Sequence, residues 1–165
     1  MGITAPCPIS NELDDSSFDC GDSTLNDWLR RRAIKNEANR SSRTFVVCNN
    51  NIIIGFYSLA VGAITRDDAL GKVRRNMPEP IPVMVLGRLA VDSHWQSKRI
   101  GTGMLKDAIQ RTIIVAEQAG IRALLVHALS DKARNFYLSC GFYASPTNDM
   151  TLMIMLDEAK NAMTQ

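Results

Sequence analysis

The sequence predicts an α/β fold in which a central mixed β-sheet is flanked by helices. The first half of the chain is rich in β-type apolar runs, among them the long run Ile52–Ala63. The second half alternates strand-like and helix-like segments, which makes a crossover unit and places Val83–Val91 parallel to Ala123–His127. Because the chain has 165 residues and no repeat, linker or low-complexity tract, we expect residues 1–165 to form a single domain.

The N-terminal part is expected to contribute an edge strand and one helix. Two prolines interrupt the segment Ile3–Ile9, and proline within a sheet is confined mainly to its edges. Asp22 or Ser23 is a suitable N-cap for a helix over about Leu25–Ala38. The apolar residues with helical spacing, which we expect to face the core, are Leu25, Trp28, Leu29, Ala33 and Ile34.

A β-hairpin is predicted next. Three consecutive asparagines, Asn49–Asn51, separate the runs Thr44–Cys48 and Ile52–Ala63, which is a strong hairpin-turn signal. Gly55, inside the second run, is expected to mark a β-bulge. A short helix over Asp67–Val73 and a proline-punctuated loop then lead the chain into the next strand.

The second half supplies the crossover unit and two further elements. We expect Ser130 or Asp131 to cap the shorter of its helices and Gly120 to end the longer one. In chain order, the predicted elements are strand Val83–Val91, helix Met104–Gly120, strand Ala123–His127, helix Lys132–Cys140 and strand Met150–Leu156.

The loop between the strand ending at Val91 and the helix expected at Met104 is the centre of the functional argument. It closes on Gly101-Thr102-Gly103, so backbone N–H groups are left free at the N-terminus of a helix, where the macrodipole is positive. Such an end binds anions, and phosphate is the usual ligand. Glycine-rich turns between strand and helix are common, so this signal alone is weak.

Charge is distributed unevenly along the chain, although its net value is only +2. Residues 1–29 contain six acidic residues and no Lys or Arg, whereas residues 30–111 contain fifteen Lys or Arg against six Asp or Glu. The basic middle part suggests an anionic ligand or partner, although a charge run taken alone is usually a solvated surface.

Cysteine usage and hydropathy limit the class of protein. The four cysteines are scattered, form no CxxC pair and have only two histidines to assist them, so we expect reduced thiols and no metal site. No run of eighteen apolar residues predicts a membrane span, and the chain begins without the basic and apolar regions of a signal peptide. These features favour a cytoplasmic protein.

Two segments together resemble a known family. Gln96–Gly103 follows a strand and opens a helix, and Ala133–Phe142, roughly thirty residues later, reads A-R-N-F-Y-L-S-C-G-F. This pair is similar to the GCN5-related N-acetyltransferases, the GNAT family. In that family a Q/R-x-x-G-x-G/A turn holds the pyrophosphate of acetyl-coenzyme A, and an A-x-x-F-Y-x-x-x-G-F segment closes the thiol end.

One residue departs from the family pattern. Arg99 stands where the family's turn usually has its first glycine. Its side chain either points outward into solvent or adds a charge-assisted contact to a phosphate, and we favour the second. The residues that the resemblance implies for the acetyl-coenzyme A site are Leu89, Ala90, Val91, Gln96, Lys98, Arg99, Ile100, Gly101, Thr102, Gly103, Asn135 and Phe136.

The resemblance implies direct acetyl transfer, with Tyr137 as the general acid that protonates the departing sulfur. A phenol with a pKa near ~10 is protonated when it is needed. The alternative role for Tyr137 is that of an aromatic residue packed in the core. We expect its neighbour Phe136 to fill that role instead. An α-amine has a pKa near ~8, so a strong base is not obligatory, and water held by backbone carbonyls is a sufficient base. The family's donor to the thioester carbonyl is the N–H of Val91 or its neighbour.

Further segments, among them Arg74–Pro78 and Leu86–Asp92, look like one subgroup of the family. That subgroup is the acetyltransferase toxins of bacterial toxin–antitoxin pairs. The resemblance implies acetylation of the α-amine of aminoacyl-tRNA, which blocks elongation. It also implies a ribbon-helix-helix antitoxin, binding of DNA through the complex, and a homodimer.

The basic residues are more numerous than one cofactor requires. A second polyanion, tRNA, explains the surplus through phosphate contacts and counterion release. The residues expected to contact tRNA are Arg30, Arg31, Arg32, Lys35, Arg43, Arg74, Arg75 and Arg88.

Two other functions stay open at this point. One is acetylation of a small amine or a protein amine; a polyamine site, which should be acidic, fits the basic middle part badly. The other is a non-catalytic, coenzyme A-binding partner of a DNA-bound repressor, against which Tyr137 and the intact thiol-end segment argue.

Overall fold

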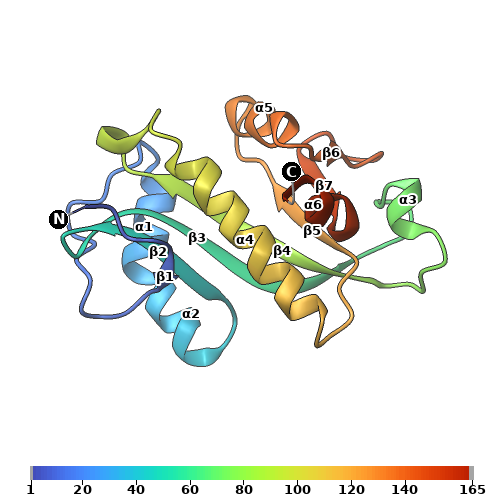
Figure 1. Cartoon of the computed structure of the whole chain (residues 1–165), viewed down its shortest axis with the longest axis horizontal. Coiled ribbons are helices and arrows are strands. Elements are labelled where there is room, and N and C mark those ends of the chain that lie inside the picture. The colour runs from blue at the N-terminus through green and yellow to red at the C-terminus, as the bar shows by residue number, and fades with distance from the viewer. Residues whose placement is uncertain (1, 164–165) are drawn as a thin grey trace. The chain divides into compact units, whose positions relative to one another are not determined.

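The chain folds on a seven-stranded mixed sheet, shown in Figure 1 as a computed structural model. The structure describes residues 2–163, with side chains described for residues 2–159. The strands lie in the order β1-β2-β3-β4-β5-β7-β6. They are β1 (Cys7–Pro8), β2 (Arg43–Asn49), β3 (Ile52–Ile64), β4 (Ile81–Val91), β5 (Ala123–His127), β6 (Tyr143–Ala144) and β7 (Thr151–Met155).

Six α-helices and one 3₁₀ turn connect the strands of the described chain. The crossover prediction is confirmed, because β4 runs parallel to β5, from Val83 opposite Ala123 to Leu86 opposite Val126. The predicted α/β class with a mixed sheet is confirmed with it. The helical elements are α1 (Ser23–Arg31), α2 (Ala33–Asn39), α3 (Gly71–Arg74), η1 (Ser93–Trp95), α4 (Ile100–Ala116), α5 (Asp131–Ser139) and α6 (Leu156–Met163).

The chain forms two compact units. The first comprises the chain through Ala60 together with Gly87–Ala108, and the second comprises Val61–Leu86 with the chain from Ile109 onward. Each unit has its own apolar cluster.

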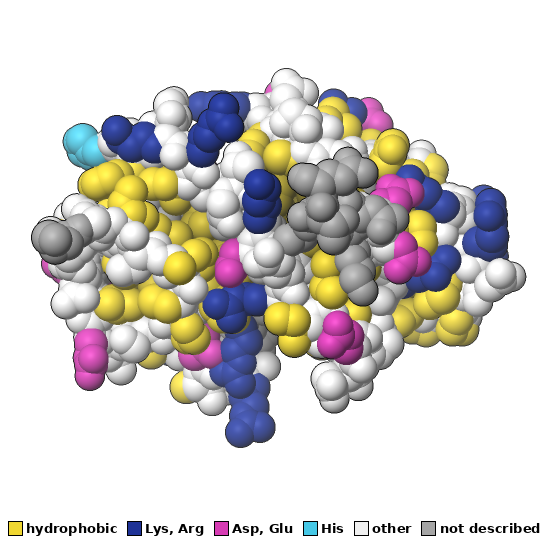
Figure 2. Space-filling model, in the orientation of Figure 1, with side chains coloured by type: hydrophobic (Ala, Val, Ile, Leu, Met, Phe, Trp, Pro, Cys, Tyr) yellow, Lys and Arg dark blue, Asp and Glu magenta, His cyan; other side chains and the backbone are white. Residues whose placement is uncertain are grey.

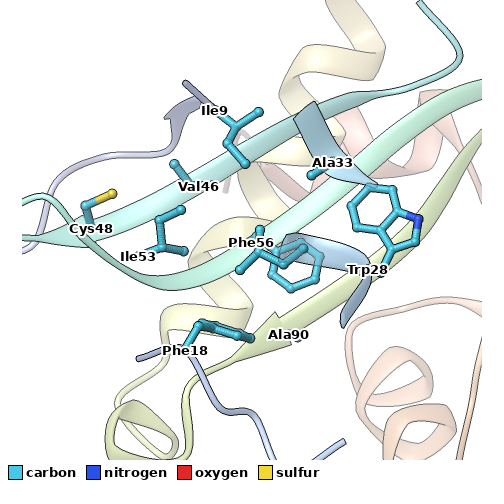
Figure 3. Close-up of a cluster of buried hydrophobic side chains, with 10 residues drawn as sticks. Ile9, Phe18, Trp28, Ala33, Val46, Cys48, Ile53, Phe56 and Ala90 are labelled. Atoms are coloured by element: carbon cyan, nitrogen blue, oxygen red, sulfur yellow. The ribbon is translucent and has the colours of Figure 1, made fainter. Parts of the chain in front are cut away.

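An aromatic cluster forms the core of the first unit, and Figure 3 shows its side chains pointing toward one another. The Trp28 ring stacks on Phe56 with 5.8 Å between centroids, and Phe18 meets Phe56 edge-on at 5.5 Å. Leu29 and Ala33 are fully buried beside them. The predicted inward face of the N-terminal helical segment is therefore confirmed.

That segment is two helices, and the prediction of one helix over Leu25–Ala38 was wrong in this respect. Asp22 caps α1 by accepting from the Thr24 N–H, at 2.9 Å. The chain changes direction at Arg32 (φ −115°, ψ −35°), and α2 begins at the next residue. No glycine or proline marks the break, so it reflects the packing of the buried residues on both helices and leaves no local sequence signal.

The hairpin and its irregularity are confirmed. Asn50 and Asn51 both have positive φ values, 52° and 65°, as a tight turn between antiparallel strands requires. Val47 lies opposite Gly55, but Cys48 lies opposite Ile53, so Ile54 is the extra residue of a bulge next to the predicted glycine.

The second unit packs around β5 and β7, which are nearly fully buried. Its short helix α3 covers only the end of the predicted Asp67–Val73 helix. Two elements, β6 and α6, were not predicted, because two residues of strand and a helix directly after an apolar strand give little pattern to read.

None of the helices in residues 2–163 has the length and hydropathy that crossing a bilayer would need.

Candidate functional site

The loop between β4 and α4 is held by a buried carboxylate. Asp92 accepts hydrogen bonds from the backbone N–H groups of Asp19 (3.0 Å) and His94 (2.9 Å). Its own N–H donates to the carbonyl of Ile54, the bulged residue of β3, at 2.8 Å. Asp92 thereby joins the N-terminal segment, the β3 bulge and the start of the loop.

The ionised form of Asp92 is the one this arrangement favours. Burial by itself would raise the pKa of the carboxyl, but the N–H donors of Asp19 and His94 and the adjacent His94 ring outweigh it and lower the pKa below its usual value. Asp92 is therefore a charged carboxylate, and its charge stabilises the hydrogen bonds that hold the loop.

Gln96 fixes the same loop from its other end. Its side-chain amide donates to the Val91 carbonyl at 3.0 Å and to the Cys20 carbonyl at 3.3 Å. The amide protons are thus directed at backbone oxygens of the protein, which positions Val91 at the end of β4. The predicted contact of Gln96 with the cofactor stays a prediction.

Helix α4 begins at Ile100, four residues before the predicted Met104, and ends at Ala116 before the predicted Gly120. Gly101, Thr102 and Gly103 therefore lie in the first turn of the helix. The left-handed residues of the loop are instead Ser97 (φ 66°) and Arg99 (φ 64°). The first turn of α4 lies at the positive end of the helix dipole, and the Gly103 N–H already donates to the Arg99 carbonyl at 3.1 Å. The predicted binding of a pyrophosphate at this helix end stays a prediction.

Arg99 occupies a backbone conformation that glycine adopts without strain. A positive φ costs an ordinary residue about 1–2 kcal/mol, because its Cβ approaches the following carbonyl. The positive φ at this position explains why the family usually has glycine there. Arg99 adopts the same conformation at the cost of backbone strain. Its side chain is exposed, as are those of Gln96 and Lys98. The predicted phosphate contact of Arg99 stays a prediction.

Strand β4 is longer than the part of it that pairs with β5. The paired positions end at Leu86, whereas β4 runs on to Val91. The predicted cofactor residues Leu89, Ala90 and Val91 all lie in this extension. Backbone N–H and C=O groups on an unpaired strand edge are free to bind an extended ligand.

Helix α5, in the second unit, carries the predicted general acid. Ser130 caps it by accepting from the Ala133 N–H at 3.1 Å, as predicted. Tyr137 is buried, with 6% of its surface exposed, and its ring packs between Phe136 (5.2 Å) and Phe142 (5.5 Å). Asn135 is exposed on the same helix.

The environment of Tyr137 keeps its hydroxyl protonated. Burial, with a smaller effect of the nearby Cys140, raises the pKa of the phenol well above its ordinary value. The phenol is therefore protonated at neutral pH, where it can donate a hydrogen bond but cannot act as a base. The raised pKa also makes it a weaker acid than an ordinary tyrosine, and its role as the general acid stays a prediction.

The basic residues of the first unit differ in how freely they can reach a ligand. Arg30 donates to the carbonyls of Phe18 and of Asp15, the latter at 3.2 Å, so it holds the N-terminal segment. Arg43 forms an ion pair with Glu37 at 2.5 Å. Arg31 at the end of α1, Arg32 between the two helices and Lys35 on α2 are exposed. Figure 2 shows basic side chains projecting into solvent.

In the second unit, two arginines that the sequence reasoning missed shape the loop that carries Arg74 and Arg75. Arg122 donates to the carbonyls of Lys72 and Val73, both at 3.0 Å. Arg66 donates to the carbonyl of Arg74 at 2.9 Å and to that of Met77. Arg74 and Arg75 themselves remain exposed.

The histidines do not form a catalytic pair. The His94 side chain is exposed. His127, at the end of β5, is exposed too, and its Nδ1 lies 2.9 Å from the Thr151 hydroxyl oxygen. In the described part of the chain, no group of three or more His, Cys, Asp or Glu side chains is arranged to hold a metal ion.

Comparisons with known proteins identify the family of the chain. Residues 40–144 match the acetyltransferase (GNAT) domain family. A "tRNA-acetylating toxin" of Mycobacterium tuberculosis (strain ATCC 25618 / H37Rv) is 46% identical over 159 residues, which cover 96% of this chain and 96% of the relative.

Two solved structures resemble the fold over nearly its whole length. One is AtaT complexed with acetyl-methionyl-tRNAfMet, with a TM-score of 0.90, 26% identity and coverage of 98% of this chain and 99% of that one. The other is a tyrosine-to-phenylalanine mutant of the AtaT toxin bound to the C-terminus of the antitoxin AtaR and acetyl-CoA. It has a TM-score of 0.85, 25% identity and full coverage of both chains (100% each). On the family match, the 46% identity and the glycine loop together, the chain belongs to the GNAT acetyltransferases.

Proposed function

We propose that this chain is a toxin that transfers the acetyl group of acetyl-coenzyme A to the α-amine of aminoacyl-tRNA and so inhibits translation. The observation that carries the proposal is the 46% identity, over 96% of the chain, to a tRNA-acetylating toxin. The resemblance to AtaT with its acetylated aminoacyl-tRNA supports the same substrate class. The family match, residues 40–144, includes residues of both compact units, which supports one catalytic domain.

Acetyl-coenzyme A is the co-substrate, and the first unit supplies the groups to bind it. The N–H groups at the start of α4, with Lys98 and Arg99, would bind the pyrophosphate. The β4 extension Leu89–Val91 would pair with the pantetheine arm, and the Val91 N–H or its neighbour would polarise the thioester carbonyl. Asn135 and Phe136 would contact the thiol end.

The chemical step is a direct transfer. The neutral α-amine attacks the thioester carbon, and the new C–N bond forms as the C–S bond breaks. The amine loses one proton to water held by backbone carbonyls, and the Tyr137 hydroxyl gives one proton to the departing sulfur. A buried, protonated phenol fits the second role.

Exposed cations would bind the RNA. Arg31, Arg32 and Lys35 in the first unit, and Arg74 and Arg75 in the second, are exposed and would contact phosphate. Arg74 also makes one long hydrogen bond, to the Arg66 carbonyl at 3.4 Å. Arg30 and Arg43 are bound to the protein itself and would contribute less.

An antitoxin is the proposed protein partner, as the AtaT–AtaR complex suggests. We propose further that the antitoxin is of the ribbon-helix-helix class, that the complex binds DNA, that the chain is a homodimer, and that it acts in the cytoplasm.

A direct assay tests the proposal. The purified protein is incubated with acetyl-coenzyme A and a mixed pool of charged tRNAs, and the released aminoacyl adenosines are analysed by mass spectrometry. We expect acetylated aminoacyl adenosines with wild type and none with Tyr137→Phe. Acetylation of a free polyamine or of a protein amine, with the tRNA pool unchanged, would overturn the substrate assignment.

A further inference from the structure

A row of small side chains crosses three adjacent strands of the first unit. Thr44 on β2 lies directly opposite Ser58 on β3. A Cβ built on Gly87 of β4 would lie only 3.0 Å from the Ser58 hydroxyl oxygen. Thr44 and Ser58 are almost fully buried, whereas the other buried strand side chains of this unit are apolar or aromatic. The row is thus a polar notch in an apolar sheet.

The hydroxyl of Thr44 has no partner. Thr44 is 0% exposed, and its Oγ1 makes no hydrogen bond within the described chain. The buried hydroxyl oxygen of Ser42, two residues earlier, lacks a partner as well. A buried hydroxyl without a hydrogen bond costs about 1–3 kcal/mol, so an unpaired one calls for an explanation, and a polar ligand that completes it is one such explanation.

A stacked cation borders the notch. Thr44 alternates with Val46 and Cys48, so it faces the side of the sheet that Trp28, Leu29 and Ala33 cover. Arg88, the residue after Gly87, lies over the Trp28 ring, with its central carbon 4.4 Å from the centroid. Within the described residues no carboxylate forms an ion pair with Arg88, and burial lowers the pKa of its guanidinium.

We propose that the notch formed by Thr44, Ser58 and Gly87 is the subsite for the aminoacyl group of the substrate. In it the Thr44 and Ser58 hydroxyls hydrogen-bond the α-amine and the ester next to it, while Arg88 binds a phosphate or the ester carbonyl at the RNA end. This inference rests on the proposed function and adds the residues that hold the reacting end of the acceptor.

Hydroxyls suit this task better than carboxylates. An amine must be neutral to attack, and a carboxylate beside it would stabilise the unreactive ammonium ion. The carboxylate of Glu37 contacts the backbone of Thr44, and both of its oxygens already have partners in the protein. One accepts from the Thr44 N–H at 3.0 Å and the other pairs with Arg43 at 2.5 Å. A neutral hydroxyl pair binds the amine without favouring its protonation.

Three single variants and one control test the subsite. Thr44→Val keeps the shape and removes the hydroxyl, Thr44→Ser restores it, and Gly87→Ala fills the notch. The control is Thr151→Val, because the Thr151 hydroxyl is also buried but has the His127 ring as its partner. Melting temperature, the Kd for acetyl-coenzyme A, and kcat/KM for a charged tRNA are measured for each.

We expect Thr44→Val to melt at or above the wild-type temperature, since no internal hydrogen bond is lost. It should bind acetyl-coenzyme A normally and lose about ten-fold in kcat/KM for charged tRNA. Thr44→Ser should recover most of that loss, Gly87→Ala should lose at least as much, and Thr151→Val should keep the wild-type kcat/KM.

Two outcomes separate the possible failures. If wild type acetylates charged tRNA and Thr44→Val does so with unchanged kcat/KM, the subsite is wrong while the proposed function stands. If wild type acetylates another class of amine and not charged tRNA, the proposed function fails, and the subsite assignment fails with it. If Thr44→Val lost as much affinity for acetyl-coenzyme A as it lost in kcat/KM, the notch would be part of the cofactor site. That result would also contradict the proposal.

Discussion

The guanidinium of Arg88 lies over the ring of Trp28, with its central carbon 4.4 Å from the centroid, although one residue comes from β4 and the other from α1. The same ring stacks on Phe56 from its neighbouring strand (Figure 3). The cation is therefore fixed by aromatic packing and leaves its N–H edges for a ligand. The α1 helix, whose other residues face solvent or the core, thereby positions a charge on the central sheet.

Removing the charge of Arg88 should weaken tRNA binding more than it weakens the fold. For Arg88→Gln we expect a loss in unfolding free energy of about 1 kcal/mol or less and a salt-dependence slope for tRNA binding that is smaller by about 1. Arg88→Lys should keep the slope but bind more weakly, since lysine lacks the planar group. An unchanged affinity in both variants would show that Arg88 does not face the RNA.

Replacing Tyr137 by phenylalanine should abolish transfer and leave cofactor binding intact. The ring packing of Tyr137 between Phe136 and Phe142 survives in the variant, so we expect the Kd for acetyl-coenzyme A to stay within a few-fold. Tyr143→Phe, at an exposed tyrosine, is the matched control and should keep full activity. Because burial raises the pKa of Tyr137, no loss of activity below pH ~10 should come from its ionisation. Full turnover by Tyr137→Phe would reject the general-acid role.

A glycine at position 99 should stabilise the loop. Arg99→Gly relieves a positive φ and should raise the free energy of unfolding by about 1 kcal/mol. Lys98→Gly, at the preceding residue without a positive φ, is the control and should not stabilise. The KM for acetyl-coenzyme A decides the role of the side chain: a rise for Arg99→Gly confirms a phosphate contact, and no change shows an outward-pointing arginine.

Neutralising Arg74 and Arg75 together should weaken tRNA binding and flatten its salt dependence. Each phosphate contact that is lost reduces the slope by about 1, so the double variant to glutamine should lose about 2. Lys106 and Lys132, exposed on α4 and α5, provide a control pair of the same charge. A slope that falls equally in both double variants would mean a non-specific effect of net charge.

Loss of the Asp92 carboxylate should destabilise the loop in a pH-dependent way. The pKa of this group is lowered in the folded state, so its contribution is present above pH ~4 and is lost as the pH falls. We expect Asp92→Ala to cost about 2 kcal/mol at pH 7 and to raise the KM for acetyl-coenzyme A. The difference from wild type should shrink toward pH 3 in urea unfolding. Asp27→Ala, at an exposed position on α1, should show no such difference.

Much of the fold could be predicted because its signals are local. The asparagine turn at Asn49–Asn51, the Ser130 cap and the apolar strand Ala123–His127 each lie within a few residues, and the structure confirms them. The break between α1 and α2 at Arg32 depends instead on how buried side chains pack, and no glycine or proline near it predicts the break. The early start of α4 has a similar origin, since its glycines adopt ordinary helical angles.

The residues of the candidate site also fall into those that could be predicted from the sequence and those that could not. The glycine loop and the α5 motif could be read from residue spacing, and the family match supports that reading. The notch of Thr44, Ser58 and Gly87 could not, because its members come from three strands and are unremarkable in sequence. Arg66 and Arg122 were missed for the same reason: in sequence an arginine that holds backbone carbonyls looks like any other arginine.

The hydrogen bonds of Asp92 and Gln96 to Asp19 and Cys20 make the acidic N-terminal segment part of the cofactor loop. Shortening the chain to begin at α1 would therefore free that loop while leaving every motif residue in place. A truncated gene product of this kind would still match the acetyltransferase family by its motifs, yet it would lack the contacts that hold the loop in place.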